Sequence, residues 1–192
     1  IEDVVDSALR YVPHWRQHGW HECNDNGNAE RLIDAFGERL RYCDELGAWF
    51  IYDGRRWQRD RVREIEDLSS QAMRRIAAEA SVAGDGEHRE LLRWALRSGD
   101  VTRFRAAIAK AASDERVRIH AADLDRDPWL LTCLNGTLDL RSGVLQSHDP
   151  GDLISRLAPV EYDSAARSPL LEQVLEQATG GDSDFSGYLQ RA

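Results

Sequence analysis

Lysine is nearly absent from this chain of 192 residues, in which Lys110 is the one lysine among 25 basic residues. The phosphate-binding loop of an ATPase has the pattern G-x-x-x-x-G-K-[ST]. That pattern does not occur, so we expect no ATP hydrolysis by this chain. Long apolar runs are missing as well. The longest runs, such as residues 48–52, are far shorter than a membrane span, so the sequence predicts no membrane contact.

Paired cysteines and a secretion signal are also missing. Cys23, Cys43 and Cys133 form no C-x-x-C pair, and no charged segment followed by an apolar one opens the chain. An odd number of cysteines without an export signal is typical of reduced thiols. The sequence therefore predicts a cytoplasmic protein.

Motifs with the spacing of metal ligands are equally scarce. The one metal-like cluster consists of His14, His18, His21 and Cys23. The first two lie four residues apart and would share a helix face, but Pro13 and Gly19 disfavour a helix there. Structural zinc sites also usually show paired Cys or Cys/His ligands. We predict no metal and interpret this segment as a solvated, aromatic-rich connector.

Positive charge is in deficit overall but concentrated locally. The formal net charge of -9 argues against tight, non-specific DNA binding through the overall field of the protein. Five arginines nevertheless surround one tryptophan, and arginine binds phosphates while aromatic rings stack on unpaired bases. Acidic residues interleave with them, so the alternative is a solvated face with the tryptophan in the core of a hairpin. The candidate DNA-binding residues are Arg55, Arg56, Trp57, Arg59, Arg61 and Arg63.

Helical periodicity dominates the centre of the chain. Apolar residues recur at three and four residues over 65–80 and 91–96, and again in a helix that Asp100 or Thr102 can cap. The same spacing predicts a helix over about 170–178, and another begins near Phe185. The dipeptides Asp53-Gly54 and Asn135-Gly136 mark two hairpin-like regions that could pair.

These patterns predict an α+β fold, a single compact domain with a helical centre and two short β-hairpin regions. Residues 1–24 would form an N-terminal helix, over 2–11, and a connector. Residues 25–192 would form the domain itself, and its last thirty residues are mostly acidic. We interpret the chain, which ends just past a predicted helix, as a fragment of a larger protein.

A motif near residue 25 consists of residue types that favour a helix start. Asp25 or Asn26 can cap a helix whose apolar residues follow in helical period. Gly27 allows a close approach or a positive φ, and Arg31 can form a structural ion pair. Because caps account for these residues at this spacing, we favour a structural role over a ligand site.

A second motif consists of turn residues. Asn135-Gly136 tolerates a positive φ, and Asp139 can hold the neighbouring backbone. A role for Asp139 as a general base is disfavoured because no partner stands at a recognisable spacing. The residues to which we assign structural roles are Asp25, Gly27, Asn28, Arg31, Asp53, Gly54, Asn135, Gly136, Asp139 and Gly143.

Taken in order, these motifs resemble the domain that precedes the superfamily III helicase core in phage, plasmid and poxvirus-type primase–helicases. The matching segments are Asp25-x-Gly27-Asn28-Ala29-x-Arg31-Leu32, Arg41-Tyr42 with Trp49, Tyr52-Asp53-Gly54-x-x-Trp57, Asp127-Pro128-Trp129-Leu130-Leu131, Asn135-Gly136-x-x-Asp139-Leu140-x-x-Gly143, His148-x-Pro150, Tyr162-Asp163 and Tyr188-Leu189-Gln190-Arg191. Each segment is common by itself, and the ordered series is what is specific. It covers nearly the whole chain, from about residue 25 onward.

The resemblance implies a non-catalytic module that links a primase to a superfamily III helicase motor, supports ring assembly and places DNA. ATP and Mg²⁺ would bind the helicase core of the parent protein, an ATP-dependent DNA helicase with a primase region. The parent would self-associate through its helicase ring. The candidate partner of the chain itself is single-stranded or forked DNA.

Two other functions are weighed against this one. The first is an independent DNA-binding module that recognises an origin or a single-stranded or forked DNA. The second is an enzyme such as a primase or nuclease, which would need a metal-binding acidic cluster. The paired carboxylates Asp123 and Asp125 are better interpreted as a solvated segment before Pro128, and the primase region would lie upstream.

Overall fold

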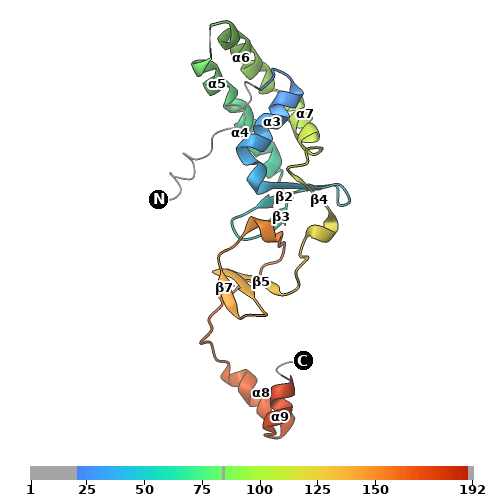
Figure 1. The fold of residues 1–192 in the computed structure, drawn as a ribbon, viewed down its shortest axis with the longest axis vertical. Coiled ribbons are helices and arrows are strands. Elements are labelled where there is room, and N and C mark those ends of the chain that lie inside the picture. The colour runs from blue at the N-terminus through green and yellow to red at the C-terminus, as the bar shows by residue number, and fades with distance from the viewer. Residues whose placement is uncertain (1–20, 84, 190–192) are drawn as a thin grey trace.

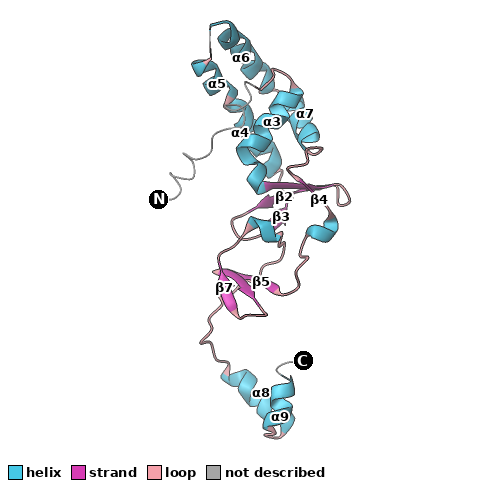
Figure 2. Ribbon diagram, in the orientation of Figure 1, coloured by secondary structure: helices cyan, strands magenta, loops and turns pink. Residues whose placement is uncertain are grey.

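The computed structural model describes residues 21–83 and 85–189. The predicted N-terminal helix over 2–11, together with His14 and His18, lies outside them. Helices gather at one end of the molecule, two small sheets follow, and a helical pair stands at the other end (Figure 1, Figure 2). The α+β class is confirmed. The division into a connector before residue 25 and a domain after it stays a prediction.

Seven α-helices and seven strands occur in the described residues. The helices are α3 (Asp25–Phe36), α4 (Glu64–Arg74), α5 (Ile76–Val82), α6 (Asp85–Ser98), α7 (Val101–Ala111), α8 (Pro169–Thr179) and α9 (Ser183–Leu189). The strands are β1 (Leu40–Cys43), β2 (Ala48–Tyr52), β3 (Trp57–Arg59), β4 (Arg118–Ile119), β5 (Leu130–Cys133), β6 (Gly136–Asp139) and β7 (Val144–Gln146). Three short 3-10 helices lie between them: η1 (Gly37–Arg39), η2 (Ala121–Asp123) and η3 (Pro150–Asp152).

The helix predicted over 65–80 is two helices in the structure. The chain turns at Arg75, whose N–H donates to the carbonyl of Ala72 three residues back (3.1 Å). This 3-10-type bond tightens the chain between α4 and α5. Periodicity does not reveal the break because the apolar spacing continues across it. The buried residues on its two sides are Ile65, Leu68, Ala72, Met73, Ile76 and Ala80.

The first sheet has the strand order β3-β2-β1-β4. β1 and β2 pair antiparallel, with Leu40 opposite Ile51, and β4 adds in parallel beside β1. β2 and β3 form the hairpin predicted at Asp53-Gly54. Gly54 there has a φ of 95°, which glycine adopts without strain.

Strand β2 of this sheet is buried on both faces. Trp49 and Ile51 of β2 join the main core beneath α3 and α4. Phe50 belongs to a second cluster on the opposite face, with Trp57 and, packed against them, Leu153. Successive side chains of a strand alternate between faces, so a strand buried on both sides is apolar throughout. The uninterrupted apolar run of β2 is explained in this way.

The second sheet, of order β5-β6-β7, is separate from the first, so the prediction that the two hairpin regions pair is wrong. The edges of the first sheet are already occupied. β4 covers the β1 edge, and at the β3 edge the N–H of Trp57 donates to the carbonyl of Ile154 (2.8 Å). The chain after β7 also extends the second sheet, since the N–H of Ala158 donates to the carbonyl of Thr132 in β5 (2.8 Å).

The helices α8 and α9 pack against each other at the far end of the molecule from α5 and α6 (Figure 1). Ser168 caps α8, and Gly180 ends it in the left-handed region with a φ of 63°. The helix predicted over 170–178 is confirmed, and the one near Phe185 begins two residues earlier, at Ser183. Neither helix contains a buried residue.

No helix among the described residues is long and apolar enough to cross a membrane. Cys23, Cys43 and Cys133 have free thiols, the last two of them buried. No group of three His, Cys, Asp or Glu side chains in this part of the chain could hold a metal ion.

A surface contact joins the turn after β1 to the chain after β4. Nδ1 of His120 lies 2.9 Å from Oε1 of Glu45, and the thiol of Cys43 donates to Oε2 of Glu45 (3.0 Å). The hydrogen bonds from Cys43 and His120 lower the pKa of Glu45 to about 2. The same hydrogen bond and the charge of Glu45 raise the pKa of His120.

The variant His120→Gln is expected to reduce the pH dependence of stability. A raised pKa in the folded state means that His120 stabilises the fold fully below its unfolded pKa, about 6.5, and that this contribution is lost as pH rises through the folded value. The lowered pKa of Glu45 acts only at the acid end, where its contribution is lost as pH falls toward about 2. Urea denaturation at pH of about 5.5 and about 8 measures the effect. The prediction would be contradicted if the free energy of unfolding changed by the same amount between the two pH values in the wild type and in the variant.

Candidate nucleic-acid interface

The motif near residue 25 forms the start of α3 and fastens it to the chain before it. The N-cap is Asn24 rather than Asp25 or Asn26, and its Oδ1 accepts the N–H of Gly27 (2.9 Å). Gly27 allows the close approach that we predicted, because a Cβ at this position would overlap the backbone carbonyl of Glu22. The preceding chain therefore crosses the helix at a point where a side chain has no room.

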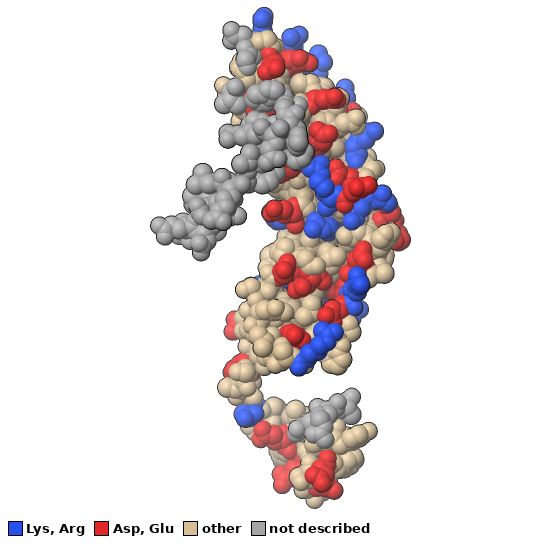
Figure 3. Space-filling model, in the orientation of Figure 1, with Lys and Arg blue, Asp and Glu red and all other residues tan. Residues whose placement is uncertain are grey.

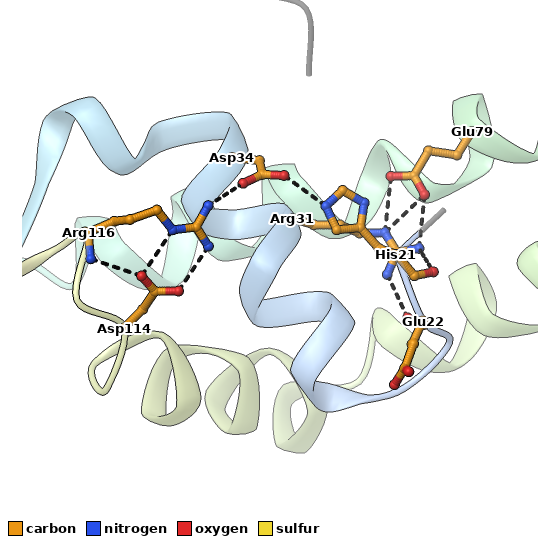
Figure 4. A network of polar contacts seen from close by, with 7 residues as sticks. All are labelled: His21, Glu22, Arg31, Asp34, Glu79, Asp114 and Arg116. Atoms are coloured by element: carbon orange, nitrogen blue, oxygen red, sulfur yellow. Dashed lines mark hydrogen bonds and ion pairs between the residues drawn. The ribbon is translucent and has the colours of Figure 1, made fainter. Parts of the chain in front are cut away.

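Arg31 is the buried centre of this region (Figure 4). Its side chain is 2% exposed and pairs with Glu79 of α5, with 2.9 Å between Nη2 and Oε2. The guanidinium also donates to the carbonyls of Glu22 (3.0 Å) and His21 (3.1 Å). The predicted ion pair is present, and it ties the incoming chain and α5 to α3.

Asp34 extends the network toward β4 (Figure 4). Its Oδ2 lies 2.9 Å from Nε2 of His21, and its Oδ1 accepts from Arg116 (2.7 Å), which also pairs with Asp114 (2.9 Å). Burial alone would raise the pKa of Asp34, but the hydrogen bonds from His21 and Arg116 outweigh it and lower the pKa. His21, one of the metal-like residues, is thus held by a carboxylate.

Asn28 is fully buried and joins α3 to α6. Its Oδ1 accepts the indole N–H of Trp94 (2.9 Å), and its Nδ2 donates to the hydroxyl of Ser98 (3.1 Å). At the helix start, Asp25 pairs with Arg103 of α7 (3.1 Å). Every polar side chain of this motif to which we assigned a structural role is occupied in holding helices together, which favours that role over a ligand site.

Asn135 makes a contact that turn chemistry did not predict. It does not adopt the positive φ that the dipeptide tolerates. Its Nδ2 donates to the carbonyl of Tyr162 and its Oδ1 accepts the N–H of Tyr162, both at 2.9 Å. The amide therefore pairs with the backbone as a neighbouring strand would and fixes the chain that leaves the second sheet.

The rest of this motif has the predicted turn roles. A Cβ at Gly136 would lie 2.5 Å from the carbonyl oxygen of Gln146, so only glycine fits between β6 and β7. Asp139 accepts the N–H of Arg141 (2.8 Å) in the following turn, where Gly143 has a φ of 71°.

Asp123 and Asp125 also hold backbone groups. Asp123 accepts the N–H of His120 (2.8 Å). Asp125 accepts both the N–H (2.7 Å) and the hydroxyl (2.6 Å) of Ser155. The two carboxylates thus face different partners, which supports a structural role for both rather than a shared metal.

Trp57 lies in the core, so the stacking role considered for it is incompatible with the structure. The side chain is 1% exposed, with the guanidinium of Arg41 4.8 Å from the ring centroid and the Tyr52 ring 5.4 Å away. The indole N–H donates to the carbonyl of Pro150 (2.8 Å). An enclosed ring cannot stack on a base, and we assign Trp57 to the junction between the first sheet and η3.

An open groove with a volume of about 870 Å³, here called the β3 groove, lies along the edge strand of the first sheet. Among the predicted residues, Arg55 lies at the hairpin turn and Arg63 at the start of α4, outside the groove lining. The arginines that line the groove are Arg39, Arg56, Arg59 and Arg61.

Three acidic residues line the same groove, but internal contacts occupy their carboxylates. Asp53 accepts two backbone N–H groups of its own turn (2.8 Å each). Burial tends to raise the pKa of Asp53, and these hydrogen bonds, with one from Gln58, lower it overall. Asp60 accepts three N–H groups at and before the start of α4 (3.0–3.1 Å), and Glu64 pairs with Arg39 (3.5 Å).

Two of the predicted arginines that line the groove, Arg59 and Arg61, are exposed. Within the part of the chain that the structure describes, neither forms an ion pair. Arg59 donates to the carbonyl of Leu46 (3.2 Å), and Arg56 is half-buried and pairs with Asp53. Figure 3 shows that basic and acidic side chains alternate over much of one face. Guanidinium groups that lack a carboxylate partner are the ones available to phosphates.

Arg39 is a groove residue that was not among the predicted ones. It belongs to η1, well before the hairpin turn, and no local pattern marks it as a neighbour of the other arginines. It reaches the groove because β1 returns beside β2, which allows Arg39 to donate to the carbonyl of Tyr52 (3.4 Å). A contact of this kind follows from strand pairing and not from residue spacing.

The chain matches a known protein family over most of its length. Residues 29–180 match the family described as D5 N terminal like. No curated protein matches the chain. The matched range includes both sheets, the β3 groove and most of the helical layer. The chain therefore belongs to the D5 N terminal like family, the domain that precedes the superfamily III helicase core in primase–helicase proteins.

Proposed function

We propose that this domain is a non-catalytic module of a DNA replication primase–helicase that links the primase to the motor, supports ring assembly and places DNA. The observation that supports DNA placement most strongly is the exposure of Arg59 and Arg61 in the β3 groove. Membership of the family supports the replication setting. Because the whole chain has a net charge of -9, the attraction is local to the groove.

The groove favours recognition of the DNA backbone and not of the bases. Its tryptophan is buried, so stacking is unavailable at this site. The exposed guanidinium groups bind phosphate oxygens, which position DNA without reading its sequence. Binding through the β3 groove is therefore expected to be salt-dependent and independent of sequence.

The double charge reversal Arg59→Glu/Arg61→Glu is expected to weaken DNA binding by ~10-fold or more, because two phosphate contacts become two repulsions. Fluorescence anisotropy of the 192-residue chain with labelled single-stranded and forked DNA measures the loss. The matched control, Arg126→Glu/Arg167→Glu, changes the net charge equally at two exposed residues outside the groove. Equal losses in the two variants, or no binding by the wild type, would contradict DNA placement by the groove.

An independent DNA-binding module is the second candidate. It is favoured by the fact that one chain builds the whole groove, from η1, β3 and the start of α4. An origin-binding module would prefer one duplex sequence over others. Competition of labelled forked DNA with unlabelled duplexes of different sequence separates the two functions, and equal competition by all duplexes supports the linking module.

A further inference from the structure

The helical pair α8–α9 exposes an apolar face that the described residues leave uncovered. Leu170 is 72% exposed and Tyr188 is 60% exposed. Short helices are marginal in water, and most of their stability in proteins comes from packing an apolar face. The pair therefore needs a partner surface. The large apolar residues exposed on it are Leu170, Leu171, Val174, Phe185, Tyr188 and Leu189.

The charge on this helical pair is of one sign. The segment from residue 168 to residue 189 contains no lysine or arginine. Figure 3 accordingly shows the pair mainly in acidic and uncharged side chains. Its acidic residues are Glu172, Glu176, Asp182 and Asp184. A partner surface would therefore combine apolar area with basic side chains.

A surface of that kind lies on the helices α4, α5 and α6. An apolar groove of about 400 Å³, here called the α4–α6 groove, is lined by Met73, Ala77 and Ala95 together with Leu92 and Leu96. Leu96, in the last turn of α6, is 86% exposed, and Leu92, in the middle of this helix, is 40% exposed.

Arginines border the α4–α6 groove. Arg74 of α4 lines it directly. On α6, Arg93 and Arg97 each follow one of the two leucines, so they form the adjacent row at helical spacing. The acidic residues of α6, such as Glu87 and Glu90, lie nearer its N-terminus. The groove thus offers an apolar surface to the apolar face of α8–α9 and a basic border to its acidic side chains.

We propose that α8–α9 of one chain docks into the α4–α6 groove of a second copy. The two surfaces lie at opposite ends of the molecule, so they meet between chains and not within one (Figure 1). Each chain offers one surface to one neighbour and the other surface to the next. Such a heterologous contact closes into a ring or continues as a filament. The inference rests on the proposed role in ring assembly and names the surfaces that carry it.

Complementation between two variants tests the contact. Leu96→Glu disables the groove, and Val174→Glu, at a side chain that is 50% exposed, disables the helical pair. Each variant alone is expected to lose association by ~30-fold or more, because a charge enters the centre of an apolar contact. An equimolar mixture is expected to form a complex of two chains and nothing larger, since one intact groove and one intact helical pair remain. Light scattering across a concentration series measures the masses.

Controls make each outcome decisive. Val144→Glu, at an exposed position of β7 outside both surfaces, is expected to associate as the wild type does, and circular dichroism checks that all variants are folded. A wild type that stays monomeric at high concentration, or a mixture that does not associate, would overturn the proposal and indicate that other parts of the parent protein cover these faces. DNA anisotropy on the same samples keeps the two proposals apart, since Leu96→Glu is expected to leave the β3 groove and its DNA affinity intact.

Discussion

Replacement of Arg31 by methionine is expected to lower the free energy of unfolding by about 3–5 kcal/mol. Methionine keeps an apolar stem but leaves Glu79, whose side chain is 10% exposed, charged and without its partner. The carbonyls of His21 and Glu22 lose their donors at the same time. Urea denaturation followed by circular dichroism measures the change.

An exposed ion pair of the same helix is the matched control. Arg103→Met breaks the ion pair between Arg103, whose side chain is 43% exposed, and Asp25, whose side chain is 30% exposed. This variant is expected to lower the free energy of unfolding by about 1 kcal/mol or less. The double variant Arg31→Met/Glu79→Met is expected to recover part of the loss, because no unpaired charge remains. Equal costs for Arg31→Met and Arg103→Met would show that the buried pair does not hold the helices together.

The second large effect is expected for Trp57→Ala, at about 3–5 kcal/mol of unfolding free energy. The substitution opens a cavity where the ring is 1% exposed and removes the hydrogen bond to the carbonyl of Pro150. Trp129→Ala is the control, because this ring is 48% exposed, and its expected cost is about 1 kcal/mol or less. Chemical denaturation of both variants gives the comparison.

The same pair of variants separates a core role from a DNA-stacking role for Trp57. If Trp57 is a core residue, Trp57→Ala lowers the stability of the protein. Its DNA affinity, measured at a temperature where the variant is folded, then changes little. A stacking residue would show the reverse, a loss of ~1–3 kcal/mol in binding with nearly unchanged stability. The second pattern would contradict the position of the ring.

Local patterns in the sequence predicted those parts of the fold whose interacting groups lie close together in the chain. Asp100 caps α7 as expected, because it accepts the N–H of Thr102 two residues later. The hairpin at Asp53-Gly54 likewise needs only its own turn. The N-cap of α3 was misplaced by one or two residues because Asn24, Asp25 and Asn26 have similar capping chemistry.

Long-range contacts account for the rest. Arg31 pairs with a residue 48 positions away, and Trp57 donates to a carbonyl 93 positions away. No periodicity reveals such partners, so the sequence left the core position of Trp57 as one of two alternatives, and the arrival of Arg39 in the β3 groove could not be predicted. The separation of the two sheets has the same origin, because it depends on the distant strand β4 and on the backbone of Ile154.

The salt dependence of DNA binding tests the central claim most directly, that phosphates bind in the β3 groove. The neutral double variant Arg59→Gln/Arg61→Gln removes two positive charges without adding repulsion. For single-stranded DNA, each lost phosphate contact makes the slope of log K against log salt less negative by about 0.7. We predict a slope that is less negative by about 1.4 in this variant and unchanged in the control Arg126→Gln/Arg167→Gln, at two exposed residues outside the groove. An unchanged slope in the Arg59/Arg61 variant would contradict the account.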